Sequence, residues 1–126
     1  MSKGLLISIV DDDEAVRASI GRLMRSLGYS AKVFSSAAEF LAFPRLDDAF
    51  CLIADIHMPA MTGIELHRTL VEAGHAIPTI LITAYPDDLL RARALSDGVM
   101  CYLPKPFDDE ALISFVRMAL ERGKQP

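Results

Sequence analysis

The chain has 126 residues, and its 13 Lys and Arg against 17 Asp and Glu give a formal net charge of −4. This length favours a single domain spanning residues 1–126 and leaves no room for a second, because domains usually hold about 100–150 residues. The acidic balance and the absence of a basic run argue against direct nucleic acid binding by this chain, which needs clustered Lys and Arg. No uncharged stretch is long enough to cross a bilayer, so we expect a cytoplasmic protein without membrane contact.

Two hydrophobic patterns alternate along the chain. Short, nearly continuous apolar runs predict buried strands, and apolar residues repeated on one face, such as Val16, Ile20 and Leu23, predict helices. Gly28 is a good terminator for the first helix, and Gly123 ends the last one. In chain order, the predicted elements are a strand at 5–10, a helix ending before 28, a strand at 31–34, a helix at 36–42, a strand at 49–54, a helix at 63–72, a strand at 77–82, a helix at 87–96, a strand at 99–103 and a helix after the acids at 108–110.

This alternation of strands and helices predicts an α/β fold. Strands joined through helices pair in parallel, and apolar strands imply helices on both faces of the sheet. Five such units in about 120 residues favour a flavodoxin-like, doubly wound parallel sheet of order 2-1-3-4-5 with five helices. In that order Cys51 and Cys101 lie two strands apart, at roughly 9–10 Å, which is too far for a disulfide. Both are expected to be small core residues.

Acidic residues and one lysine follow the strands at the edge where their carboxyl ends meet. Asp11 and Asp12 follow the first strand, Asp55 the third, Thr83 the fourth and Lys105 the fifth. Three carboxylates in one crevice repel each other unless a cation compensates, and Mg²⁺ suits such oxygen ligands. A carboxylate beside Mg²⁺, a lysine and a hydroxyl is suited to in-line attack on phosphorus, so Asp55 is the expected nucleophile.

Other polar residues have simpler interpretations. Asp13 and Asp87 precede helices and are expected to act as caps, and the acids at 88 and 108–110 are expected to do the same or to occupy first turns. The three histidines, His57, His67 and His75, share no metal-ligand spacing, so surface or loop positions are expected for them. Tyr102, taken alone, is expected to be a half-buried strand aromatic.

Several separated motifs together resemble the receiver domains of two-component response regulators, the CheY-like superfamily, over residues 5–122. They are Ile9-Val10-Asp11-Asp12-Asp13, Asp55-Ile56-His57-Met58-Pro59, Met61-Thr62-Gly63, Thr83-Ala84 and Lys105-Pro106-Phe107. The sequences of residues 62–66 and 102–107 are most similar to those of receivers that precede a helix-turn-helix transcription domain. Residues 123–126 are then a tail or the start of a linker, and any output must come from another chain or from sequence not present here.

The resemblance implies a role for each residue of the crevice. Asp55 is the phosphoacceptor, Asp12 a direct Mg²⁺ ligand, Asp11 a ligand through water, and the backbone carbonyl of His57 a further ligand. Lys105 pairs with the phosphoryl group and, in this family, typically precedes a cis peptide bond to proline. Thr83 hydrogen-bonds the phosphoryl group. Thr83 and Tyr102 are also the switch residues, which change position when Asp55 is phosphorylated. Residues expected to tune the phosphoryl lifetime are His57, Ala84 and Tyr85.

The implied function is a phosphorelay switch that accepts a phosphoryl group from a sensor histidine kinase or a phosphotransfer protein. Phosphorylation then alters the face built from the fourth helix, the fifth strand and the fifth helix, which can serve a partner or a homodimer. The chain is a signalling switch and not an enzyme, apart from its own aspartyl phosphorylation and dephosphorylation. Three alternatives remain: a phosphorylation-independent docking module, a flavin-binding module, which the acids after the first strand disfavour, and a haloacid-dehalogenase-type hydrolase, which would need an acid where His57 stands.

Overall fold

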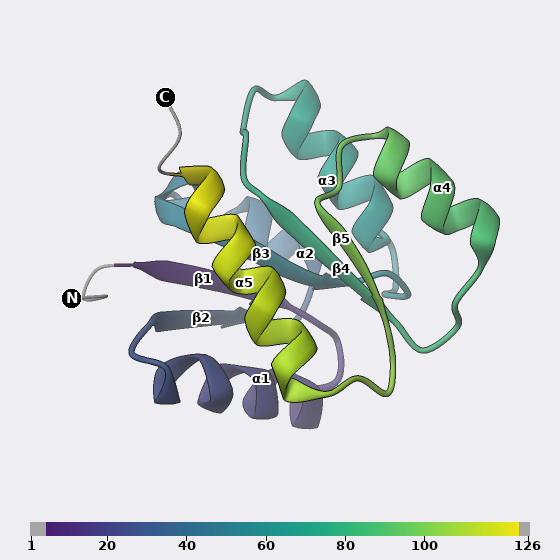
Figure 1. The fold of residues 1–126 in the computed structure, drawn as a ribbon. Helices are drawn as coiled ribbons and strands as arrows, with labels where there is room; N and C mark the ends of the chain where they lie inside the picture. Colours follow the sequence, from purple (N-terminus) through teal and green to yellow (C-terminus); the bar gives the residue numbers. More distant parts are fainter. Residues whose placement is uncertain (1–4, 124–126) are drawn as a thin grey trace.

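A computed structural model describes residues 5–123 and shows the expected alternation of strands and helices (Figure 1). The strands are β1 (Leu6–Val10), β2 (Ser30–Phe34), β3 (Ala49–Asp55), β4 (Thr79–Thr83) and β5 (Cys101–Pro104). The helices are α1 (Glu14–Ser26), α2 (Ala37–Leu41), α3 (Gly63–Glu72), α4 (Asp88–Ser96) and α5 (Asp109–Gly123), with a 3₁₀ turn, η1 (Leu46–Asp48), before β3.

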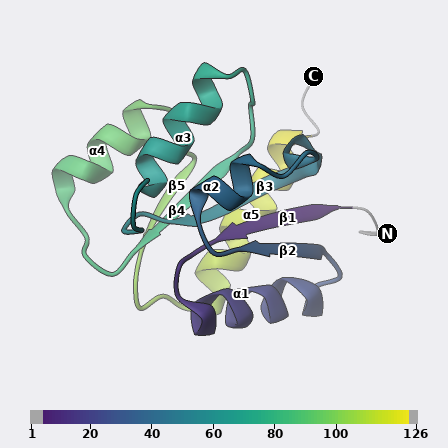
Figure 2. The same ribbon diagram turned by 180° about the vertical axis from the view of Figure 1, so that it is seen from behind.

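The five strands form one parallel sheet in the order β2-β1-β3-β4-β5, which confirms the predicted topology. Helices α1 and α5 cover one face, and α2, α3 and α4 cover the other (Figures 1 and 2). Each face has its own hydrophobic cluster: Ile20 of α1 and Val116 of α5 lie in one, and Phe40 of α2 and Leu70 of α3 in the other. Cys51 and Cys101 are buried and free, as expected.

Side-chain caps fix where the helices begin. Asp13 accepts hydrogen bonds from the amides of Ala15 and Val16, so its predicted role as the cap of α1 is confirmed. Asp87 does the same for α4, while Thr62 and Glu65 form a reciprocal capping box at α3. Such caps satisfy amide groups that have no partner inside the helix. The loops that carry polar residues at the carboxyl edge of the sheet are therefore firmly joined to the helices that follow them.

Helix α3 begins directly against the end of β3. The amide of Gly63 donates to the carbonyl of Ile56 at 3.0 Å. A Cβ atom at position 63 would lie well inside contact distance of the Asp55 carbonyl oxygen, and at 3.1 Å from both the Asp55 carbonyl carbon and Leu81 Cδ2. Only glycine therefore allows α3 to start this close to Asp55.

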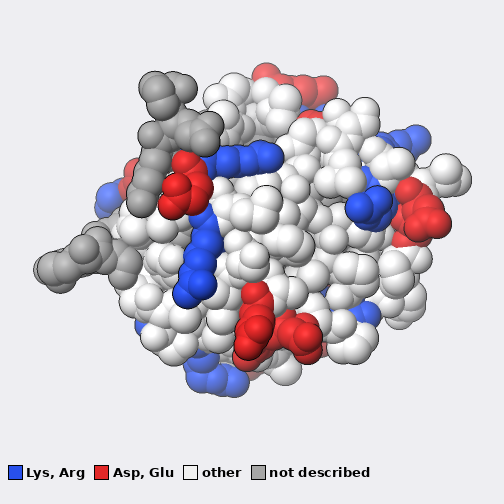
Figure 3. Space-filling model, in the orientation of Figure 1, with Lys and Arg blue, Asp and Glu red and all other residues white. Residues whose placement is uncertain are grey.

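The surface carries charges of both signs. On the face shown in Figure 3, basic and acidic side chains lie in small separate groups, and no continuous basic patch is visible there. No helix within residues 5–123 has the length and apolar character required to span a membrane.

Candidate functional site

Three carboxylates meet at the carboxyl edge of the sheet, between β1 and β3. Each of Asp11, Asp12 and Asp55 places one carboxylate oxygen within 4.8 Å of the others. Asp11 and Asp55 are only 1 % and 5 % exposed, whereas Asp12 is exposed. Because β1 and β3 are neighbours in the sheet, their ends bring together residues more than forty positions apart in the chain.

Asp11 is the most constrained of the three. Its amide donates to the carbonyl of Phe34 at 3.1 Å, its Oδ1 accepts from the amide of Asp13 at 2.8 Å, and its carbonyl accepts from Nη1 of Arg17 at 2.7 Å. Its Oδ2 is buried and has no hydrogen-bond partner within the described residues. Burial raises the pKa of Asp11 and the charge of Asp55 adds to this effect, although the hydrogen bond from Asp13 opposes it.

Lys105 is the cation of the site. Its Nζ lies 3.1 Å from Asp55 Oδ1 and 3.7 Å from Asp11 Oδ2, and its side chain is 24 % exposed. Burial alone would lower the pKa of this lysine, but the hydrogen bond with Asp55 and the charge of Asp11 outweigh it, so the pKa is raised. The peptide bond between Lys105 and Pro106 is cis, as the resemblance implied. Lys105 is therefore charged and bridges the two buried carboxylates.

Thr83 ends β4 at the same edge and is completely buried. Its Oγ1 accepts a hydrogen bond from the amide of Tyr85 at 3.0 Å, so the hydroxyl hydrogen is still available to another acceptor. The rings of His57 and Tyr85 pack edge to face, with centroids 5.3 Å apart, and both residues and Ala84 are exposed. This aromatic pair links the loop after β3 to the loop after β4.

Tyr102 joins the sheet to α4. Tyr102 is 9 % exposed, so it is buried and not half-buried as expected. The hydroxyl accepts a hydrogen bond from the amide of Asp87, the cap of α4, at 3.0 Å. Helix α4 itself buries only Ala94, and Leu89 is 83 % exposed. The Tyr102 hydroxyl is thus one of the few contacts that fix the start of this helix.

Comparison with known proteins assigns the family. Residues 7–117 match the response regulator receiver domain. The chain belongs to this family. A receiver is a signalling switch of two-component systems and not a classical enzyme, and receivers bind Mg²⁺ at an acidic pocket, which corresponds here to the carboxylate cluster. This assignment does not favour a phosphorylation-independent docking module.

Among its relatives is the response regulator protein TodT of Pseudomonas putida, 38 % identical over 95 % of this chain and 53 % of its own length. The transcriptional regulatory protein FixJ of Azorhizobium caulinodans is 36 % identical over 99 % of this chain and 59 % of its own. The receiver therefore spans little more than half the length of these curated relatives. A crystal structure of FixJ-N superposes with a TM-score of 0.85 at 36 % identity, covering 93 % of this chain and 94 % of that one. A receiver protein from Pseudoalteromonas atlantica gives 0.87 at 30 % identity, covering 94 % and 99 %.

Besides Tyr102, two residues differ from the sequence interpretation. His67 is not on the surface: it is 5 % exposed, because it lies on the same face of α3 as the buried Ile64 and Leu70, three positions away on either side. Its spacing within the apolar pattern would have shown this. Arg17 was not predicted as part of the site, yet it contacts Asp11. The available signal was a cation close to the start of a helix, where the helix dipole disfavours positive charge.

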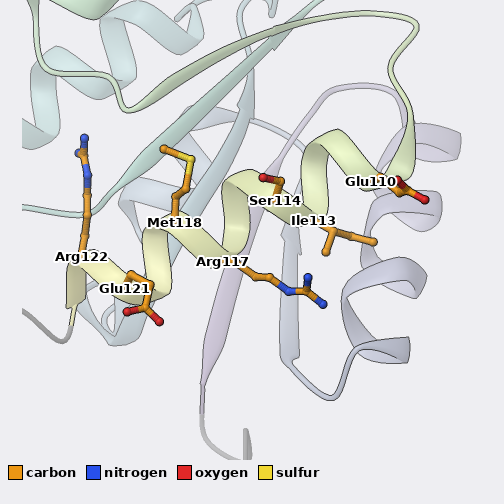
Figure 4. Close-up of a pocket in the computed structure, with 7 residues that line it drawn as sticks. All are labelled: Glu110, Ile113, Ser114, Arg117, Met118, Glu121 and Arg122. Atoms are coloured by element: carbon orange, nitrogen blue, oxygen red, sulfur yellow. The ribbon is translucent and has the colours of Figure 1, made fainter.

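A hollow along α5 lies apart from these residues (Figure 4). Seven α5 residues of mixed polarity line it: Glu110, Ile113, Ser114, Arg117, Met118, Glu121 and Arg122. All of them project from a single helix, and none belongs to the acidic cluster or its lysine. We assign no chemistry to it.

Proposed function

We propose that this receiver, working in the cytoplasm, accepts a phosphoryl group on Asp55 from a phosphohistidine of a sensor histidine kinase or a phosphotransfer protein. The supporting observation is the Asp55 carboxylate itself, which is nearly buried, paired with Lys105 at 3.1 Å and adjacent to two further carboxylates. The two buried free thiols are typical of a reducing compartment.

The residues present fit a magnesium ion. All candidate ligands are hard oxygen atoms, which Mg²⁺ prefers. Asp11 Oδ2 is a buried carboxylate oxygen without a hydrogen-bond partner within residues 5–123, and Lys105 Nζ, 3.7 Å away, offsets only part of the charge of the three carboxylates. A further cation would therefore lower the cost of burying this oxygen. Asp11, Asp12, Asp55 and the backbone carbonyl of His57 would hold the ion. When bound, Mg²⁺ would neutralise negative charge of the carboxylates and of the incoming phosphoryl group.

In the transfer step, a carboxylate oxygen of Asp55 forms a bond to phosphorus while the bond from phosphorus to the donor nitrogen breaks. The electron pair of that bond leaves with the imidazole. Lys105 is placed to follow the negative charge from the free carboxylate to the phosphoryl oxygens, since its Nζ already lies beside Asp55. Thr83 has a hydroxyl hydrogen to donate to one of those oxygens, because its oxygen already accepts from Tyr85.

The switch would then pass from Thr83 through Tyr102 to α4. A phosphoryl group adds about −1.5 to −2 charges and strong acceptor oxygens, which draw the Thr83 hydroxyl toward them. Movement of that strand end changes the contacts of Tyr102, whose hydroxyl fixes Asp87 at the start of α4. The face formed by α4, β5 and α5 would change for a partner or a second copy of this chain.

His57, Ala84 and Tyr85 border the site and would tune the phosphoryl lifetime. The receiver core, residues 5–122, would control an output in a longer protein, such as transcription, which is the role that the name of the transcriptional regulatory protein FixJ gives to that relative.

The test is phosphorylation by a small donor such as acetyl phosphate, with and without Mg²⁺, followed by intact mass measurement. Wild type should gain one phosphoryl group only with Mg²⁺, and Asp55→Asn should gain none. Asp13→Asn is the matched control, since it removes an acid that lies close to the site but caps a helix. Phosphorylation of Asp55→Asn at the wild-type rate would refute the assignment of the phosphoacceptor.

A further inference from the structure

Arg17 reaches back from α1 to the loop that carries the acidic pair. Its Nη1 donates to the backbone carbonyl of Asp11 at 2.7 Å, while its own amide donates to the carbonyl of Asp13 at 3.0 Å. The side chain therefore spans the turn between β1 and α1 and closes it from the helix side. A bond of this length from a charged guanidinium is among the stronger hydrogen bonds in proteins.

The hydrogen bonds of Asp11 show what Arg17 adds. The amide of Asp11 donates to the carbonyl of Phe34 in β2, and Asp11 Oδ1 accepts from the amide of Asp13. The amide and the side chain of Asp11 are therefore fixed without Arg17. The carbonyl of Asp11 belongs to the peptide unit that leads into Asp12, and Arg17 holds that carbonyl. Asp12 is exposed, and its carboxylate has no hydrogen-bond partner within residues 5–123, so its direction depends on the backbone before it.

The location of Arg17 carries an electrostatic cost. A cation close to the first turn of a helix opposes the positive end of the helix dipole, and α1 otherwise begins with acids, Asp13 and Glu14. Hydrogen bonding to a carbonyl beside three carboxylates offsets this cost. Helix formation alone would therefore disfavour an arginine at this position, whereas its hydrogen bond to Asp11 supports the loop that carries the acidic cluster.

We infer that Arg17 is a positioning residue for the acidic site: its bond to the Asp11 carbonyl orients the peptide between Asp11 and Asp12 so that both carboxylates face one cation. This inference rests on the proposed function, because it supposes that Mg²⁺ binds there. Residues that orient metal ligands in this way typically change metal affinity by roughly 10–100-fold when they are removed.

Charge and geometry predict opposite results for Arg17→Ala. If the arginine acted only through its charge, its removal would strengthen Mg²⁺ binding, since one repelling cation would be lost near the site. If it orients the peptide, its removal weakens binding despite that gain. The sign of the change therefore decides between the two, and phosphorylation activity is not needed to read it.

The same helix provides a matched control. Arg25 also lies on α1 and donates to a backbone carbonyl six positions away, that of Ala31, at 3.2 Å, but at the opposite end of the helix. Arg25→Ala removes the same charge and the same kind of hydrogen bond outside the site. Arg17→Lys keeps the charge and one donor on a side chain of similar length.

The experiment is a titration of unphosphorylated wild type and the three variants with MgCl₂, in which changes of the amide NMR shifts report Mg²⁺ binding. We expect Arg17→Ala to weaken Mg²⁺ binding about tenfold, Arg25→Ala to leave it within about twofold, and Arg17→Lys to recover most of the loss. Unchanged or tighter binding in Arg17→Ala, or an equal loss in Arg25→Ala, would overturn the inference. Absence of Mg²⁺ binding in wild type would instead refute the metal site of the proposed function.

Discussion

Gly63→Ala should damage the fold and the phosphoacceptor together. The added methyl carbon would overlap the carbonyl oxygen of Asp55 and would lie 3.1 Å from both the Asp55 carbonyl carbon and Leu81 Cδ2. Neither side can yield easily, because Asp55 is paired with Ile82 of β4 and the amide of Gly63 is bonded to Ile56. The overlap can be relieved only if the start of α3 moves away from β3.

The magnitude follows from these contacts. Overpacking against fixed backbone costs about 3 kcal/mol, the upper part of the usual range. Loss of the bond from Gly63 to Ile56 adds about 1 kcal/mol, and the better helix propensity of alanine returns at most about 1 kcal/mol. The free energy of unfolding should therefore fall by about 3 kcal/mol, which lowers Tm by roughly 10 °C in a domain of this size.

Urea unfolding followed by circular dichroism measures this change, because the chain has no tryptophan to report by fluorescence. Gly21→Ala is the matched control: its methyl group would meet only side-chain atoms, Arg25 Nη1 at 3.3 Å and Val33 Cγ1 at 3.6 Å. That variant should be unchanged or more stable by up to about 1 kcal/mol. A Gly63→Ala protein within about 1 kcal/mol of wild type, with an unchanged urea slope, would show that the close approach of α3 to Asp55 is wrong.

Four further predictions concern buried polar groups. Ser8→Ala should leave stability unchanged or raise it by up to about 1 kcal/mol in urea unfolding, because the fully buried Ser8 hydroxyl has no hydrogen-bond partner within residues 5–123. Asp11→Asn should stabilise the metal-free protein, since burial raises the pKa of Asp11 and so disfavours its charged form, and should abolish the rise in Tm on adding Mg²⁺. Burial lowers the pKa of His67, so protonation favours the unfolded chain and the free energy of unfolding should fall as the pH drops below about 6.5. Unfolding measured between about pH 7.5 and 5.5 should show a smaller fall for His67→Leu than for wild type. Tyr102→Phe should cost about 0.5–1.5 kcal/mol and should speed amide hydrogen exchange in the first turn of α4 more than in the sheet, because the hydroxyl that holds the amide of Asp87 is lost.

The fold was predictable because pattern and topology agree along the chain. The predicted helix at 63–72 has the observed bounds of α3, and the predicted start of α4 at 87 is its cap. The larger differences lie at strand ends. Strand β4 begins at Thr79 and not at 77, after Pro78, which has no amide hydrogen for a ladder bond. Strand β5 extends to Pro104 because it is an edge strand, where a missing donor is tolerated.

The juxtaposition of the acids and the lysine was also predictable, because parallel strands place their carboxyl ends at one edge. The contacts that orient them were not. The bond from Arg17 to a backbone carbonyl, the packing of His57 on Tyr85 and the bond from Tyr102 to the cap of α4 depend on side-chain directions that periodicity does not specify. The burial of His67 was available from its spacing in α3 and was missed because histidine was treated as a surface residue by type.

Helix α4 has a consequence for how receivers of this kind can diversify. Of its nine residues, only Ala94 is buried and Leu90 is partly buried against the core, while the other seven are exposed and contribute little to the free energy of folding. Substitutions along this helix can therefore accumulate without unfolding the domain, whereas the residues around Asp55 are constrained by the close approach of α3. Selection can then change the surface that α4 offers to other molecules independently of the chemistry at the carboxylates. Duplicated copies of such a domain could keep one reaction and acquire different binding preferences through this one helix.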